Sequence, residues 1–310
     1  MPDSTPSLIV IAGPTGVGKS RVALDLAERI GGEIVSADSR QVYRQMDIGT
    51  AKPLPEERCR VPHHLIDVVD PDQEFTLAHY RDLATAAIKD ILARGRIPLL
   101  VGGTGLYIRA VTEGLAVPAV PPDPEYRALL EQRASTEGGG TLHRELGAVD
   151  PEAAASIEPK NVRRVIRALE VYRATGRPFS AQQESIPPPF ELQKIGLTCN
   201  RELLYGRIDQ RVDAMMEVGL LNEVQRLVAR GYGWDLPAMS GIGYRQLGQH
   251  LRGEMDLPSA VQRIKYETHR YARQQYTWFS LEDASIRWFY VIENHPDVID
   301  TLAREFDPSL

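Results

Sequence analysis

The sequence of 310 residues has little of what marks a secreted or membrane-bound protein. Its two cysteines, Cys59 and Cys199, are too few for a disulfide framework and neither lies in a CxxC pair, so we expect both to be reduced and structural. The N-terminus has no basic start, and the apolar run at 8–12 is too short for a signal peptide or a membrane span. These absences predict a cytoplasmic protein with no membrane partner.

An excess of positive charge is also missing, since the formal net charge is −6 at pH 7. Nucleic acids are polyanions, so this balance argues against a general nucleic-acid binder, and any such site must be a local basic patch. Hydrophobic residues make up 43% and charged residues 25%, which is usual for a globular protein. The length favours one large domain with an inserted or appended part.

Short apolar runs alternate with helical patterns over much of the chain. Strands of a buried parallel sheet are nearly continuous apolar runs, and helices connect them. The alternation therefore predicts an α/β fold with a doubly wound parallel sheet. Strands are expected at 8–12, 33–36, 64–69, 97–101, 194–198 and 287–292. Helices are expected at 19–30, at 76–94 with Thr76 as the N-cap, after 102–105, and as one long helix at 202–230.

The alternation stops between two proline-rich segments, at 117–124 and 187–189. Between them no run is typical of a strand. Helical patterns occupy 124–136, 141–147 and 161–175, with a flexible glycine link at 138–140. Because proline-rich segments are semi-rigid and domain boundaries fall in such linkers, we predict a helical insertion domain at 117–190. The catalytic core is then formed by 1–116 and 191–310.

A glycine-rich loop between the first expected strand and helix fits the phosphate-binding pattern G-x-x-x-x-G-K-S/T. Its glycines let backbone N–H groups turn towards an anion, and the helix N-terminus adds partial positive charge. Lys19 supplies a full charge to the terminal phosphate, and the Ser20 hydroxyl can reach Mg²⁺. The residues predicted to bind phosphate are Gly13, Pro14, Thr15, Gly16, Val17, Gly18, Lys19 and Ser20.

This loop does not identify the phosphate compound. A GTPase needs a guanine-reading Asn-Lys-x-Asp segment, which is absent, whereas a small-molecule kinase stays open on the loop alone. The segment Ser36-Ala-Asp-Ser-Arg-Gln-Val-Tyr-Arg-Gln-Met-Asp-Ile-Gly-Thr-Ala-Lys-Pro53 resembles the Asp-Ser-x-Gln-Val-Tyr…Gly-Thr-Ala-Lys-Pro stretch of the tRNA dimethylallyltransferases, or isopentenyltransferases. Further matches follow in the order of that family, from about residue 8 to 280: His63-His-Leu-Ile-Asp67, Gly102-Gly-Thr-Gly-Leu-Tyr107, Arg167-Ala-Leu-Glu-Val-Tyr172, Arg207-Ile-Asp-Gln-Arg211, Gly241-Ile-Gly-Tyr244 and Gln275-Tyr-Thr-Trp-Phe279.

The resemblance implies a phosphate-loop α/β core with a helical insertion, in agreement with the interruption at the prolines. It implies transfer of a dimethylallyl group from dimethylallyl diphosphate to N6 of the adenosine 3′-adjacent to the anticodon, position 37 of tRNA, with release of diphosphate. Mg²⁺ is the expected cofactor, the tRNA anticodon stem-loop the expected partner, and a monomer the expected state. The rival hypotheses are a small-molecule P-loop kinase and a non-catalytic tRNA-binding module, and the intact Lys19, Ser20 and Asp38 argue against the second.

The expected chemistry needs a base and a stabilised leaving group. The exocyclic amine of adenine is a weak nucleophile, and a carboxylate can take its proton as the new bond forms. Asp38 follows an expected strand, where α/β folds place ligands, and matches the family's general base. Lys19 and the rest of the loop stabilise the leaving diphosphate, and Thr104 matches a family position near the amine and the diphosphate. Arg207 and Arg211 lie one helical turn apart, so either can clamp the diphosphate. A turn-forming Asp38, a helix-capping Thr104 and ion-paired arginines stay open as structural interpretations.

A basic segment in the expected insertion offers a site for tRNA. From 155 to 180 six basic residues stand against two acidic ones, and Arg163, Arg164 and Arg167 crowd one helix face. A charge run is usually a solvated face, but the family places tRNA contacts at this helix. The predicted tRNA contacts are Asp38, Ser39, Arg40, Gln41, Thr104, Arg163, Arg164, Val165, Ile166, Arg167, Gly243, Tyr244 and Arg245. The chain departs from the family pattern at Pro159-Lys-Asn161 and Arg273-Gln274, which bears on tRNA contacts more than on chemistry.

Overall fold

The computed structural model describes residues 7–115, 118, 120–182, 185–292 and 296–306. The chain divides into two compact units, Met1–Thr112 together with Pro189–Leu310, and Glu113–Pro188. The domain boundary expected at 116–117 lies outside the described residues, as does the N-terminal segment that lacks a basic start. Each unit has its own hydrophobic core.

The first unit contains a six-stranded sheet with the strand order β3-β2-β4-β1-β5-β6. Every neighbouring pair is parallel, which confirms the predicted doubly wound parallel sheet. β1 is central, with Ile9 opposite Leu99 on one side and Gln193 on the other. The strands are β1 (Ser7–Ala12), β2 (Gly32–Ala37), β3 (His63–His64), β4 (Ile97–Gly102), β5 (Glu191–Thr198) and β6 (Ile286–Tyr290).

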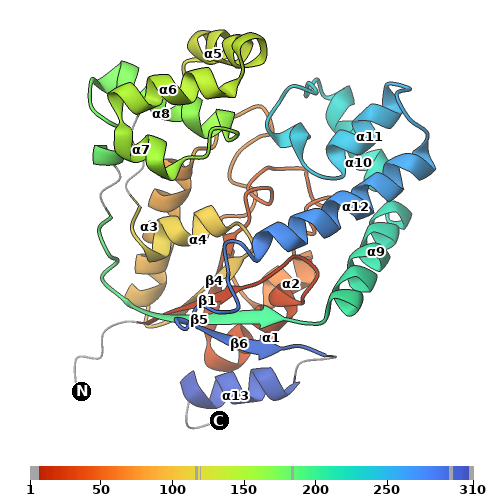
Figure 1. Ribbon diagram of the computed structural model, residues 1–310. Coiled ribbons are helices and arrows are strands. Elements are labelled where there is room, and N and C mark those ends of the chain that lie inside the picture. The colour runs from red at the N-terminus through yellow and green to blue at the C-terminus, as the bar shows by residue number, and fades with distance from the viewer. Residues whose placement is uncertain (1–6, 116–117, 119, 183–184, 293–295, 307–310) are drawn as a thin grey trace. The chain divides into compact units, whose positions relative to one another are not determined.

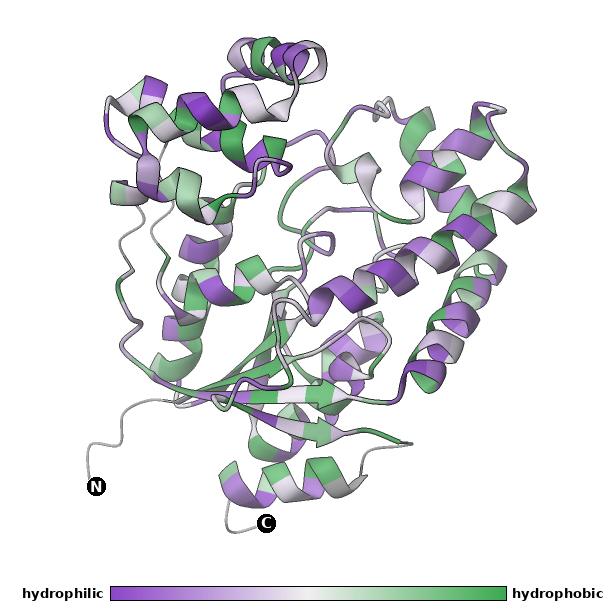
Figure 2. Cartoon of the chain, in the orientation of Figure 1, coloured by the Kyte–Doolittle hydropathy of each residue, from purple (hydrophilic) through white to green (hydrophobic). Residues whose placement is uncertain are grey.

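Each face of the sheet has a separate core, because successive side chains of a strand point to opposite faces. Ile9 and Ile11 pack with α1 (Lys19–Ile30) and α13 (Pro296–Phe306). Leu8 and Val10 pack with α3 (Leu77–Ala93) and α4 (Gly105–Thr112). Figure 1 shows these helix layers on either side of the sheet. The strands are mostly hydrophobic and the helices striped in Figure 2, as expected for a sheet covered on both faces.

A third core joins the C-terminal helices to the segment after β2. The helices are α9 (Arg201–Glu217), α10 (Leu220–Ala229), α11 (Tyr244–Leu251) and α12 (Leu257–Gln275), and the short α2 (Pro55–Arg60) ends the segment. Glu223 of α10 is 1% exposed, and its carboxylate accepts hydrogen bonds from the backbone N–H groups at 47–49 and from the Tyr244 hydroxyl. This buried carboxylate fixes the position of the segment that follows Asp38.

The second unit is helical, as predicted for the insertion. Its helices are α5 (Pro124–Glu137), α6 (Gly139–Val149), α7 (Pro151–Ser156) and α8 (Val162–Thr175). Leu142 and Leu146 of α6 are buried with Val165 and Leu169 of α8 in a core of the unit's own. An isolated antiparallel bridge between Leu115 and Ser185 lies where the chain enters and leaves this unit.

Some elements differ from the predicted ones for local backbone reasons. The strand expected at 64–69 pairs over two residues, because Leu65 and Asp67 have φ angles of 62° and 57° and leave the extended conformation. The long helix expected at 202–230 is two helices, since Gly219 with φ 102° separates α9 from α10. The expected flexible glycine link is wrong, because residues 139 and 140 begin α6. We did not predict α7, although Asp150 before a proline is a usual helix start.

Candidate active site

The Gly13–Ser20 loop follows β1 at the carboxyl edge of the sheet, and its last two residues begin α1. Gly13 and Gly16 have φ angles of 145° and 85°, which other residues rarely adopt. A Cβ added at Gly13 would lie 2.4 Å from the carbonyl oxygen of Leu197 in the neighbouring β5. Glycine is therefore required where the loop turns beside β5.

Lys19 folds back over its own loop. Its Nζ donates hydrogen bonds to the carbonyl oxygens of Gly13 and Pro14, both at 2.9 Å. Burial and the neighbouring charge of Arg211 lower the pKa of Lys19 to about 7, although the Asp38 carboxylate acts in the opposite direction. An anion in the loop would favour the charged lysine, so the site is electrostatically suited to a phosphate group.

The structure distinguishes the two arginines of α9. Arg211 donates from Nη2 to the Thr15 hydroxyl at 2.8 Å, and its buried Nε has no hydrogen-bond partner among the described residues. Burial lowers the pKa of Arg211 while the charge of Asp38 raises it. Arg207 instead donates to the carbonyl oxygen of Ile292 at 2.6 Å. Arg211, with an unsatisfied donor at the loop, is the arginine placed to contact a diphosphate.

Asp38 follows β2, and one of its carboxylate oxygens closes the next turn. Its Oδ1 accepts hydrogen bonds from the backbone N–H groups of Arg40 at 2.8 Å and Gln41 at 3.4 Å. In the described part of the chain no hydrogen bond reaches Oδ2. Its charge acts on both Lys19 and Arg211, which places the carboxylate within electrostatic range of the phosphate loop. The turn-forming role of Asp38 is therefore real, and it leaves the second oxygen for another task.

Thr104 follows β4 and lies against the Asp38 segment. Its hydroxyl accepts a hydrogen bond from the Ser39 backbone N–H at 3.1 Å, and its own N–H donates to the carbonyl oxygen of Ala37 at 3.2 Å. The hydroxyl is thus directed to the segment after β2 instead of capping α4. Because β4 lies between β2 and β1, the loops carrying Asp38, Thr104 and Lys19 follow one another along the sheet edge.

Two residues of α12 approach this site without having been predicted there. Gln275 hydrogen-bonds the backbone of Thr15 and of Gly103. Tyr271, one turn earlier, contacts Thr104 and Gln275, and burial together with the charge of Asp38 raises its pKa to about 12. The motif at 275–279 was recognised in the sequence, but nothing local to it indicates which loops the helix meets.

The side chains of Arg40 and Gln41, both predicted to contact tRNA, form hydrogen bonds within the protein. Arg40 donates to the carbonyl oxygen of Pro237 at 2.6 Å and to the Ser240 hydroxyl at 3.3 Å. Gln41 accepts from the Ser36 hydroxyl at 3.0 Å and donates to two carbonyl oxygens at 50 and 51. Their side chains hold the segment after Asp38 in place.

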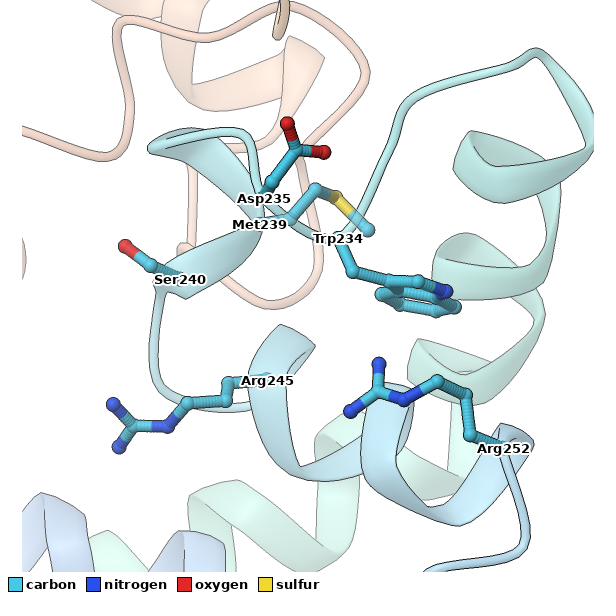
Figure 3. Close-up of a pocket in the computed structure, with 6 residues that line it drawn as sticks. All are labelled: Trp234, Asp235, Met239, Ser240, Arg245 and Arg252. Atoms are coloured by element: carbon cyan, nitrogen blue, oxygen red, sulfur yellow. The ribbon is translucent and has the colours of Figure 1, made fainter. Parts of the chain in front are cut away.

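Near the Arg40 contacts lies a hollow of about 310 Å³ that contains no residue of the phosphate loop. Figure 3 shows its lining: Trp234, Asp235, Met239, Ser240, Arg245 and Arg252. The Arg252 guanidinium stands 5.1 Å from the centre of the Trp234 ring, and Arg245 forms an ion pair with Glu267.

Gly243 and Tyr244, also predicted to contact tRNA, have different surroundings. Gly243 has φ 96° and precedes α11, whereas Tyr244 is 1% exposed and donates to Glu223 at 2.6 Å. The Tyr244 side chain thus belongs to the third core, and contact of this residue with tRNA stays a prediction.

The basic helix α8 divides into an outer and an inner face. Arg163 and Arg164 are exposed and have no ion-pair partner in the described residues. Val165 and Ile166 are 0% and 3% exposed, so their side chains belong to the core of the second unit, and contact of these residues with tRNA stays a prediction. Arg167 pairs with the buried Glu170 at 2.6 Å and donates to the Val120 carbonyl oxygen at 2.9 Å. Of these three arginines, Arg163 and Arg164 are the exposed ones, with no ion-pair partner among the described residues.

No three His, Cys, Asp or Glu side chains of the described residues come together as a metal site. Ser20 is exposed in the first turn of α1, beside the loop. Within the same residues, no helix is long and apolar enough to cross a membrane.

Comparison with known proteins identifies the family. The family model for IPP transferase matches residues 41–282, and that for isopentenyl transferase matches residues 6–63. The chain belongs to the IPP transferase family. A relative from Roseiflexus sp. (strain RS-1), named tRNA dimethylallyltransferase, is 58% identical over 272 residues, which cover 88% of this chain and 89% of the relative. A relative of the same name from Dehalococcoides mccartyi is 48% identical and covers 96% and 92%.

Solved structures of the family have the same fold. The full-length tRNA isopentenylpyrophosphate transferase from Bacillus halodurans superimposes with a TM-score of 0.70 at 42% identity, covering 97% of each chain. A eukaryotic dimethylallyltransferase described as acting on tRNA gives a TM-score of 0.76 at 29% identity, covering 93% of this chain and 75% of that one.

Proposed function

We propose that this enzyme transfers a dimethylallyl group from dimethylallyl diphosphate to N6 of the adenosine 3′-adjacent to the anticodon of tRNA, position 37. The observation that carries the proposal is that Asp38 and Lys19 lie on neighbouring loops of one sheet edge, where Arg211 of α9 is hydrogen-bonded to Thr15 and the charge of Asp38 acts on both cations. A displacement on an allylic diphosphate needs a base for the nucleophile and cations for the leaving group in one site. Relatives named tRNA dimethylallyltransferase cover most of the chain.

In this reaction the N6 lone pair forms a bond to the allylic carbon, and the electron pair of the breaking C–O bond leaves with the diphosphate. Asp38 takes the N6 proton through Oδ2, while Oδ1 keeps its bonds to the next turn. Thr104, hydrogen-bonded to the Ser39 backbone, lies between the base and the loop. These hydrogen bonds hold Asp38 in place while it takes the proton from N6.

The leaving group accumulates negative charge, which the loop is built to receive. Lys19 exchanges its two carbonyl partners for diphosphate oxygens, and Arg211 directs its unsatisfied Nε to the same group. Backbone N–H groups of the loop and the α1 N-terminus add to this field. Preorganised donors of this kind stabilise developing charge without reorganisation.

The loop residues fit a Mg²⁺ ion held mainly through the substrate. In phosphate sites Mg²⁺ keeps several waters and takes few protein ligands beside phosphate oxygens. The exposed Ser20 hydroxyl has no hydrogen-bond partner in the described residues and would be the protein's ligand. When bound, the ion neutralises charge on the diphosphate.

We propose that the enzyme acts as a monomer, because the base, the phosphate loop and the clamping arginine all come from one chain. We also propose a cytoplasmic location, where tRNA is found. tRNA is held by the exposed arginines of α8 and by backbone and polar groups after Asp38. The small-molecule kinase alternative is not favoured, since the matches over most of the chain are to tRNA prenyltransferases.

The test is an incubation of purified enzyme with tRNA, dimethylallyl diphosphate and Mg²⁺, followed by mass spectrometry of the nucleosides. The proposal predicts adenosine carrying one dimethylallyl group at the position 3′ of the anticodon. A parallel incubation with ATP and no tRNA tests the kinase alternative. ATP consumption without prenylated adenosine would overturn the proposal.

A further inference from the structure

A buried glutamine outside the phosphate loop joins two loops of the proposed site. Gln275 is the last residue of α12 and is 3% exposed. Its Oε1 accepts a hydrogen bond from the Thr15 backbone N–H at 2.7 Å, and its Nε2 donates to the Gly103 carbonyl oxygen at 2.9 Å. Each end of the amide is thus bonded to the main chain of a different loop.

These two loops serve different parts of the reaction. Thr15 belongs to the phosphate loop, and its hydroxyl accepts the hydrogen bond of Arg211. Gly103 directly precedes Thr104, which is hydrogen-bonded to the residues on both sides of Asp38. One side chain therefore connects the loop for the leaving group with the turn that supports the base.

This connection is tight. A Cβ added at Gly103 would lie 2.1 Å from the Gln275 amide nitrogen, so the turn and the side chain are in direct contact. Tyr271, one helical turn before Gln275, contacts Thr104 as well. Gln275 ends a helix of 19 residues, so the side chain that joins the two loops is itself held by that helix.

We infer that Gln275 is a positioning residue that fixes the phosphate loop relative to Asp38 and so aligns the allylic donor with the acceptor amine. This inference rests on the proposed function. Both polar ends of its side chain are bonded to the main chain, so it acts through Thr15 and Gly103. Since reacting atoms must approach to about 3–3.5 Å, a small shift between the loops lowers the rate strongly.

Gln275→Glu tests the inference within one protein. A protonated glutamic acid can accept from Thr15 and donate to Gly103 as glutamine does, whereas an ionised glutamate repels the Gly103 carbonyl. Burial raises the pKa of a carboxyl group. The single-turnover transfer rate of the variant, divided by that of the wild type at each pH, should therefore approach one at low pH. It should fall as the pH rises through the pKa of the introduced carboxyl group.

Matched variants separate positioning from folding. Gln275→Met keeps the length but makes neither hydrogen bond, and its transfer rate at saturating substrates should fall about 10²-fold at every pH. Its affinity for inorganic diphosphate, measured by calorimetry, should fall by less than about tenfold, which corresponds to the loss of one hydrogen bond. Gln225→Glu changes an exposed glutamine of α10 and should give a rate ratio that does not depend on pH.

A Gln275→Glu rate ratio that is flat with pH, in a protein that stays folded by circular dichroism, would overturn the inference. A Gln275→Met variant that transfers at the wild-type rate would do so too. If the wild type itself forms no prenylated adenosine, the proposed function fails. The ratio of inorganic diphosphate affinities of Gln275→Glu and wild type against pH then still tests whether Gln275 positions the loop.

Discussion

At the residue scale, the phosphate loop keeps its lysine in contact with its own backbone until an anion arrives. Lys19 donates to two loop carbonyl oxygens and has a pKa of about 7, so in the free protein only part of the lysine is charged near neutral pH. Binding of a diphosphate raises this pKa again, because an opposite charge favours the protonated form. The affinity for diphosphate is therefore linked to proton uptake.

Lys19→Ala removes the side-chain cation within the loop itself. Losing one charge-assisted contact to the leaving group should cost about 3 kcal/mol of transition-state stabilisation, or ~10² in rate. Single-turnover transfer assays measure the rate, and calorimetry with inorganic diphosphate measures the affinity. Turnover within about threefold of the wild type would show that this loop does not hold the leaving group.

The same lysine gives a pH dependence with a definite sign. Below a pKa of about 7 the free Lys19 is protonated, and above it the charge is lost, so diphosphate affinity should decline as the pH rises above 7. The decline approaches tenfold per pH unit until the pKa of the bound lysine is reached. Lys19→Ala, measured over the same pH range, corrects for titration of the ligand. An equal decline in both proteins would contradict the assignment to Lys19.

Asp38→Asn should separate chemistry from binding. Asparagine keeps the Oδ1 acceptor that bonds the N–H groups of Arg40 and Gln41, so the turn persists, but it cannot take a proton. Removal of a general base typically costs ~10²–10⁴ in rate. The loss should appear in the single-turnover rate, while the dissociation constants for tRNA and diphosphate change little. A variant that fails only because tRNA no longer binds would remove Asp38 from the role of base.

The sequence alone identified the site residues that lie next to the strands positioning them. The loop pattern and the segment after β2 identified Lys19 and Asp38, because glycines, lysine and carboxylate are contiguous with the strands that place them. Gln275 lies 260 positions after Thr15, and its role depends on where α12 packs. No local pattern contains that information. The choice between Arg207 and Arg211 likewise required the path of α9 across the loop.

At the scale of the element, α8 shows how one helix combines a core face with a basic face. Val165 and Ile166 are buried and Arg163 and Arg164 are exposed, as the i, i+3, i+4 spacing of apolar residues would have indicated. The family resemblance covered the whole stretch and did not separate the two faces. The Arg167 guanidinium pairs with the buried Glu170, which Arg127 contacts as well, so we expect it to contribute less to tRNA binding than Arg163 and Arg164.

Arg163→Ala with Arg164→Ala should weaken tRNA binding and leave diphosphate binding unchanged. Two fewer phosphate contacts release fewer counterions, so the slope of log K against log salt should become less negative by roughly 2. Binding titrations at several salt concentrations measure the slope. An unchanged slope would show that Arg163 and Arg164 face solvent and do not contact tRNA phosphates.

Arg167→Ala is the matched control on the same helix. It should lower the free energy of unfolding, because Glu170 is 1% exposed and loses a partner, while the salt slope of tRNA binding stays near that of the wild type. Chemical denaturation measures the first quantity. A slope change as large as that caused by the change of Arg163 and Arg164 would show that Arg167 contacts tRNA phosphates too.

At the scale of the whole molecule, the alternation of strands and helices was enough to predict the parallel sheet and the helical insertion. It was not enough for the strand order. β4 lies between β2 and β1, and this placement depends on contacts between segments about 60 to 90 positions apart. The net charge of −6 likewise concealed a locally basic helix in the second unit.

The two units should be separable, since each has its own core and Leu115 pairs with Ser185 where the chain enters and leaves the insertion. Paired backbones lie about 5 Å apart, so a short glycine–serine linker can replace the segment between these two residues. The shortened protein should fold and bind inorganic diphosphate within about twofold of the full chain, because effects at independent sites add. Its affinity for tRNA should fall by more than about tenfold, since the phosphate contacts of α8 are lost.

Calorimetry measures the diphosphate affinity and filter binding measures the tRNA affinity. The full chain and the variant with Arg163 and Arg164 changed to alanine are measured beside the shortened protein. Unchanged tRNA affinity would place the tRNA contacts in the first unit, and loss of diphosphate binding by a folded protein would show that the insertion supports the phosphate loop.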